Sequence, residues 1–162
     1  MPDKNIKAYL NHHLAGSVAG LETLEHLMEA EKGSPMARVL TELRAEGMAD
    51  RQVLEGLMAR LEVSESGTRK ATAWLGEKVF RVFLPLNEKT SGALNLLLTL
   101  EALALGLQGR RALWLSLSIA AKETAALQGL DYQTLVKRAE DQRERVEKLR
   151  LEAAEKALRP AR

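Results

Sequence analysis

The sequence contains no cysteine, and it contains little proline and few aromatic residues. Its 162 residues include four prolines, and aromatic side chains make up 4% of the chain. The absence of cysteine excludes disulfides, zinc ribbons, iron–sulfur clusters and thiol catalysis. The scarcity of proline leaves few interruptions for long helices. A dominant charge is also missing, because 24 basic and 22 acidic side chains leave a formal net charge of +2, which is too small to steer a partner.

Neither a signal peptide nor a membrane span is expected. Residues 1–7 carry charges with no apolar segment behind them, unlike a signal peptide. The most apolar stretch, residues 93–107, is interrupted by Glu101 and is shorter than the roughly 20 residues that cross a bilayer. We therefore expect a single domain over residues 1–162, in the cytoplasm and with no membrane partner.

Apolar residues recur at helical spacing through almost the whole chain, and they predict an all-α fold. Ile6, Leu10 and Leu14 begin a stripe at the roughly 3.6-residue spacing of an α-helix. Ser34 and Pro35 predict a helix N-cap followed by proline at the first helical position. The predicted helices cover residues 4–32, 35–62, 68–84, 91–126 and 131–158.

Four of these helices are long enough to form a bundle, and their connections predict its topology. The connections at residues 33–34 and 128–130 are short, so each should form an antiparallel helical hairpin. The connection at 64–90 can run the whole length of a helix, so the third long helix can start at the same end as the second. Two hairpins joined by a long crossover that contains a short helix form the ferritin-like four-helix arrangement.

Polar residues on the core-facing stripes are expected at mid-bundle, where burying them costs energy unless they are paired. Glu101, for example, is the only charged residue in the apolar stretch 93–107. We expect the acids to be ionised and paired with arginine, with Arg143 or Arg51 as the partner of Glu101 and His13 as a further partner. The candidate polar core comprises His13, Glu46, Asp50, Arg51, Glu101, Gln142 and Arg143.

Four segments carry a resemblance to known proteins. They are residues 12–22 (HHLAGSVAGLE), 49–51 (ADR), 100–106 (LEALALG) and 149–154 (LRLEAA). Together with the layout of the bundle, these segments resemble a group of small uncharacterised bacterial ferritin-like proteins. The resemblance implies a ferritin-like fold, and in that superfamily a di-metal carboxylate site lies at the middle of the bundle.

The usual ligands of such a site are missing from this sequence. The di-metal pattern takes Glu from two helices and Glu-x-x-His from the other two, whereas Tyr9, Leu10 and Thr23 stand three residues before the three histidines. Arginine on the last helix repels a divalent ion and pairs with carboxylates. We therefore expect no metal and no cofactor, and a salt-bridge network in place of the metal. If a metal is bound, its ligands should be His13, Glu46, Asp50 and Glu101.

Two further groups of residues each have two interpretations. Trp74, Phe80 and Phe83 either line a ligand groove or dock the crossover helix onto the bundle. The basic residues in 110–111 and 143–150 are candidates for nucleic-acid binding. Acids interleave with the basic residues of the last helix and no stacking aromatics accompany them, so we expect no nucleic-acid partner.

The sequence favours a non-catalytic, metal-free ferritin-like structural or interaction protein over an enzyme. We expect a homodimer, because the third long helix and the crossover carry abundant apolar surface. The alternative function is a metal-binding ferritin-like oxidoreductase or storage protein with a reduced ligand set. A third possibility is a carrier of an apolar ligand held between the helices.

Overall fold

Four long α-helices make up most of the computed structural model, which describes residues 3–64 and 92–159. They are α1 (Lys4–Ala30), α2 (Ala37–Arg60), α4 (Gly92–Ala120) and α5 (Tyr132–Ala157), with a 3-10 helix, η1 (Ala125–Leu127), before α5. These two ranges contain no strand, and the described part of the chain is all-α as predicted. The predicted helix at 68–84 and the group Trp74, Phe80 and Phe83 lie outside the described residues.

Side-chain caps and glycines set several helix ends. Asp3 caps α1, and Asp131 caps α5 by accepting hydrogen bonds from the backbone N–H and the hydroxyl of Thr134 at 3.1 and 2.7 Å. Gly33 and Gly129 follow α1 and η1 with φ angles of 80° and 93°, a left-handed conformation that glycine adopts without strain. The predicted role of Asp131 is confirmed.

Two helix ends differ from the prediction. Ser34 does not cap α2, which begins at Ala37 with Met36 in the cap position. The reason is a turn in which the N–H of Ala37 donates to the carbonyl of Ser34 at 3.2 Å. The end of α4 lies at Ala120 rather than at 126, because the chain turns there into η1 and buries Leu127 completely.

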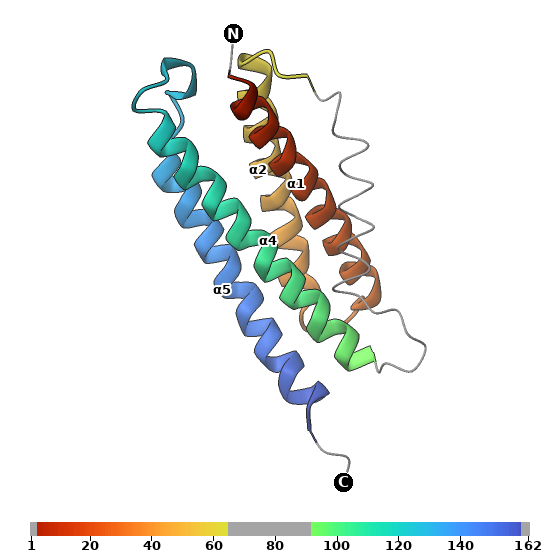
Figure 1. Cartoon of the computed structure of the whole chain (residues 1–162). Coiled ribbons are helices and arrows are strands. Elements are labelled where there is room, and N and C mark those ends of the chain that lie inside the picture. The colour runs from red at the N-terminus through yellow and green to blue at the C-terminus, as the bar shows by residue number, and fades with distance from the viewer. Residues whose placement is uncertain (1–2, 65–91, 160–162) are drawn as a thin grey trace.

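The long helices form two antiparallel pairs (Figure 1). From the N-terminal end α1 runs to the far end of the molecule and α2 returns, whereas α4 runs in the same direction as α2 and α5 runs back. The most extensive packing joins α4 to α5, followed by α1 with α2 and α1 with α4, and α2 has few close contacts with α5. The bundle therefore has one seam between α1 and α4 and another between α2 and α5.

Buried apolar side chains form two clusters along the bundle. One surrounds Trp114 and includes Leu127 of η1, and the other includes Leu40 and Leu100. The four long helices pass from one cluster to the other over residues 14–21, 43–54, 107–113 and 135–146. Buried Asp50 and Gln142 fall within these intervals, so the candidate site lies between two apolar cores.

The helix α4 is also long and apolar enough to suit a membrane span. Its mean hydropathy is 1.3 over the best 18-residue window, 22% of which is buried in the structure. The side chains of Leu105 and Ile119 are 58% and 66% exposed. Apolar surface therefore remains on α4 outside the bundle core.

Candidate functional site

Asp50 is the centre of a polar group between the two apolar clusters. Its side chain is 2% exposed and lies 2.7 Å from Nη2 of Arg138 and 3.4 Å from Nη1 of Arg110. The contact with Arg138 is an ion pair without the angle of a hydrogen bond. Gln142 donates from Nε2 to Asp50 at 3.0 Å and accepts at Oε1 from Arg110 at 3.0 Å. One carboxylate thus joins α2, α4 and α5.

Glu46 extends this group toward the surface, one turn before Asp50 on α2. It accepts a hydrogen bond from Nη2 of Arg145 at 2.5 Å and another from Nε2 of Gln142 at 3.1 Å. The second terminal nitrogen of Arg145 lies 4.0 Å from exposed Glu42. We call the whole group the polar layer: Glu46, Asp50, Arg110, Arg138, Gln142 and Arg145.

The polar layer contains more positive than negative charge. Three arginines face the two carboxylates of Asp50 and Glu46, and Glu42 touches only the outer edge. Burial lowers the pKa of Arg110, an effect that the charge of Asp50 opposes. Burial raises the pKa of Glu46, but the hydrogen bonds from Arg145 and Gln142 outweigh it and lower that pKa overall. The carboxylate of Glu46 is therefore held ionised by these hydrogen bonds.

His13 lies beside the polar layer but does not pair with its carboxylates. The imidazole packs edge to face against Tyr9 and His12, with centroid distances of 4.6 and 5.3 Å. Desolvation, aided by the charge of His12, lowers the pKa of His13 to about 4. At neutral pH the ring is therefore uncharged, so it cannot balance a buried carboxylate.

A cavity of about 270 Å³ lies between α1 and α4 and reaches the polar layer. Asp50, Arg110 and Gln142 line one part of it. Glycines line much of the rest, and a methyl group added to any of them would have no neighbour within 4 Å among the described residues, apart from its own helix. These cavity glycines are Gly16, Gly20, Gly106 and Gly109.

Besides Oδ1 of Asp50, which is ion-paired with Arg138, two polar atoms at this cavity are buried without a hydrogen-bond partner in the described part of the chain. They are Nε1 of Trp114 and Oγ of Ser17. Trp114 is 1% exposed. Both residues line the cavity. A buried donor without a partner typically costs about 1–3 kcal/mol, so these two groups need an explanation.

The predicted core residues divide into two sets. Glu46, Asp50 and Gln142 meet in the polar layer, and His13 lies next to it. Arg51 instead pairs with Glu55 on its own helix at 2.7 Å.

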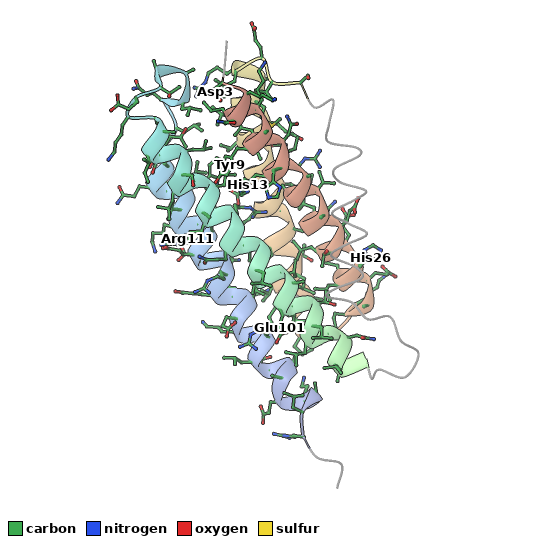
Figure 2. The ribbon with its side chains drawn as sticks, viewed as in Figure 1. Asp3, Tyr9, His13, His26, Glu101 and Arg111 are labelled. Atoms are coloured by element: carbon green, nitrogen blue, oxygen red, sulfur yellow. The ribbon has the colours of Figure 1, made fainter. Side chains whose placement is uncertain are left out.

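The predicted partners of Glu101 are wrong. Arg143 is exposed, and Glu101 lies 3.6 Å from Arg150. Figure 2 shows Glu101 in the lower part of α4, far from His13 on α1. The physical reason is the level of each residue along the bundle, since Glu101 precedes Arg110 by nine residues, or about 13.5 Å of helix.

Sequence reasoning missed the cations that satisfy Asp50. Arg110 continues the apolar stripe of Leu103, Leu107 and Trp114 at helical spacing, which would have indicated that it points inward. Its neighbour Arg111 forms a separate ion pair with Glu140 at 2.6 Å. Adjacent arginines therefore have different roles, which the basic dipeptide alone does not reveal.

The geometry does not suit the metal site implied by the resemblance. Within residues 3–64 and 92–159, no group of three or more histidine, aspartate or glutamate side chains could hold a metal ion. The proposed ligands His13, Glu46, Asp50 and Glu101 do not converge, and arginines occupy the space around Asp50. Comparisons with family models, with curated proteins and with solved structures gave no significant match.

Proposed function

We propose that this protein is a non-catalytic, metal-free helical bundle of the ferritin-like type, with an arginine–carboxylate layer where such bundles hold metal. Support for the ferritin-like part comes from the helix directions in Figure 1, with α2 and α4 running the same way between two antiparallel pairs. Support for the metal-free part comes from the polar layer at mid-bundle. The proposed role of the protein is structural, or that of an interaction partner for other proteins.

The observation that carries this proposal is that Asp50 is ion-paired with two arginines. Its two carboxylate oxygens face Arg138 and Arg110, and the amide of Gln142 occupies a further acceptor position. A divalent cation at Asp50 would have to displace a buried guanidinium and then lie beside another one. Like charges at such distances in a partly desolvated site repel strongly.

The environment of His13 argues against acid–base catalysis at this site. A general base works best with a pKa near the working pH and usually has a partner that orients it. His13 has a pKa of about 4, and its neighbours in the structure include the rings of Tyr9 and His12. Among the described residues, no carboxylate forms an ion pair with His13.

Elemental analysis tests the proposal directly. The protein is purified without chelators, and iron, manganese and zinc are measured per chain, before and after incubation with each ion. We expect far less than one ion per chain, and no rise in melting temperature, since a ligand that binds the native state would raise it. Stoichiometric iron or manganese would favour the second function, a metal-binding oxidoreductase or storage protein.

For the assembly we propose a cytoplasmic homodimer that binds neither nucleic acid nor membrane. Its support is the exposed apolar surface, which includes Ile119 at 66% exposure and Leu151 at 54%. The mass in solution, measured by light scattering, should be twice that of the chain. Ile119→Glu should yield a monomer. The control is Leu158→Glu, at an exposed position next to the end of α5, which should leave the dimer intact. A monomeric wild-type protein would overturn the dimer.

A further inference from the structure

The glycines between α1 and α4 lie where bundles usually place larger side chains. Glycine inside a helix is less stable than alanine, so four of them weaken α1 and α4. Close packing of the four described long helices does not account for them, because a methyl group at Gly16, Gly20, Gly106 or Gly109 would meet no other described residue within 4 Å outside its own helix. The missing side chains leave room along the seam instead.

The seam between α1 and α4 also contains polar groups whose hydrogen-bonding capacity the described residues do not fill. Trp114 is 1% exposed, yet within residues 3–64 and 92–159 its indole N–H has no acceptor and the hydroxyl of Ser17 has no partner. Both hydrogen bonds that Arg110 makes with described residues start at Nη1, so Nε and Nη2 remain available as donors. All three residues line the same cavity, and all three can donate to an oxygen.

These groups lie toward one end of the cavity. Since α1 and α4 run in opposite directions (Figure 1), Ser17 on α1 lies near the level of Arg110 and Trp114 on α4. Leu24 and Leu103 line the opposite end. The cavity therefore has a donor-rich end, where Arg110 lies beside its counter-charge Asp50, and an apolar end.

We propose that this cavity binds a small amphiphile, a monocarboxylate with a medium-length hydrocarbon tail. Its carboxylate lies at the end lined by Ser17, Arg110 and Trp114, where it accepts the unused hydrogen bonds and offsets the excess positive charge of the polar layer. Its tail lies along the glycines toward Leu24 and Leu103. The volume of about 270 Å³ exceeds the roughly 150 Å³ of an apolar cavity that binds benzene, so a ligand of this class fits.

Octanoate and 1-octanol form a matched pair of probes, because they share a tail and differ in the head group. Binding is measured by calorimetry and by the indole ¹H–¹⁵N signal of Trp114, in a Trp74→Phe protein that keeps a single tryptophan. We expect one octanoate per chain, a shift of the Trp114 signal, and at least about tenfold weaker binding of 1-octanol, the effect of losing one charge-assisted hydrogen bond.

Two exposed helical glycines provide the variant and its control. Gly106→Leu places a side chain in the cavity and should weaken octanoate binding at least about tenfold, a change of about 1.4 kcal/mol. Gly56→Leu on α2, also in open space but away from the cavity, should leave binding unchanged. Both variants should fold, because leucine favours helix over glycine. Ser17→Ala tests the head group without disturbing the salt bridges and should weaken binding about threefold to tenfold.

Three results would overturn the proposal. Equal affinity for octanoate and 1-octanol would refute the carboxylate, and octanoate binding that survives Gly106→Leu would refute the site. A dimer that dissociates in Gly106→Leu, with no binding of octanoate to the wild type, would assign the seam to a second copy of the chain. None of these results depends on metal content, so failure here is separate from failure of the proposed metal-free role.

Discussion

Asp50 is expected to contribute more to stability than any other polar residue of the bundle. Asp50→Leu removes the counter-charge of Arg110, whose side chain is 16% exposed, and an acceptor of Gln142. Arg138 is 35% exposed and can turn toward water, so the cost arises mainly at Arg110. Removing one partner of a buried ion pair costs about 3–5 kcal/mol, a large share of the roughly 5–15 kcal/mol that stabilises a domain.

Arg110→Met should cost less than Asp50→Leu. The carboxylate of Asp50 keeps Arg138 at 2.7 Å and Gln142 at 3.0 Å, so its charge is not stranded and we expect a loss of about 1–3 kcal/mol. The double variant has neither buried charge and should be more stable than the sum of the two losses predicts. The coupling energy should be at least about 1 kcal/mol.

Urea unfolding at pH 7, followed by far-UV circular dichroism, measures these changes in the free energy of unfolding. Arg143→Leu is the control, because Arg143 is an exposed arginine on α5 and leucine has a similar helix propensity. We expect it to change stability by less than about 0.5 kcal/mol. Strict additivity of Asp50→Leu and Arg110→Met would refute the pair, and so would a larger loss in Arg143→Leu than in Asp50→Leu.

Three further predictions use the same unfolding assay. The pKa of His13 is about 4 in the folded chain, well below the usual value for histidine of about 6.5. The unfolded state therefore takes up a proton first, and stability falls as the pH drops from about 6.5 to about 4. His13→Gln should reduce that fall, whereas His26→Gln should not. Tyr132→Phe should cost about 1–2 kcal/mol, because the buried hydroxyl donates to the carbonyl of Leu127 at 2.5 Å; an unchanged midpoint would contradict this role. Glu101→Leu should leave stability almost unchanged, because its side chain is 42% exposed, and a large loss would show that its charge is buried.

The helices and the inward-facing polar residues follow from local rules, which is why they could be predicted. Asp131 caps α5 through its own side chain, a contact within three residues. Asp50 and Gln142 lie on stripes of buried leucine, alanine and valine, and a helical residue at that spacing must face the core. These features depend on neighbours along one helix and need no knowledge of the other helices.

The pairing of residues between helices depends on the turns, and that part could not be predicted. Arg111 faces Glu140, and ten residues earlier on α4 Glu101 faces Arg150, ten residues later on α5. This constant register is set where α4 stops at Ala120 and η1 intervenes. At this register Arg143 lies seven residues, or about 10.5 Å of helix, before Arg150 on α5, so the predicted pair of Glu101 and Arg143 fails.

The wide seam between α2 and α5 makes the bundle sensitive to ionic strength. Few close backbone contacts join these helices, and charged pairs of Asp50 with Arg138 and of Glu46 with Arg145 bridge them. At about 1 M salt the Debye length shrinks to roughly 3 Å, which weakens the more exposed pair first. The α4–α5 hairpin also has the partly exposed pairs Arg111–Glu140 and Glu101–Arg150, but its much more extensive packing makes it less sensitive to this screening. Concentrated salt should therefore speed amide hydrogen exchange in α2 selectively, so that the bundle opens along one edge before it unfolds as a whole.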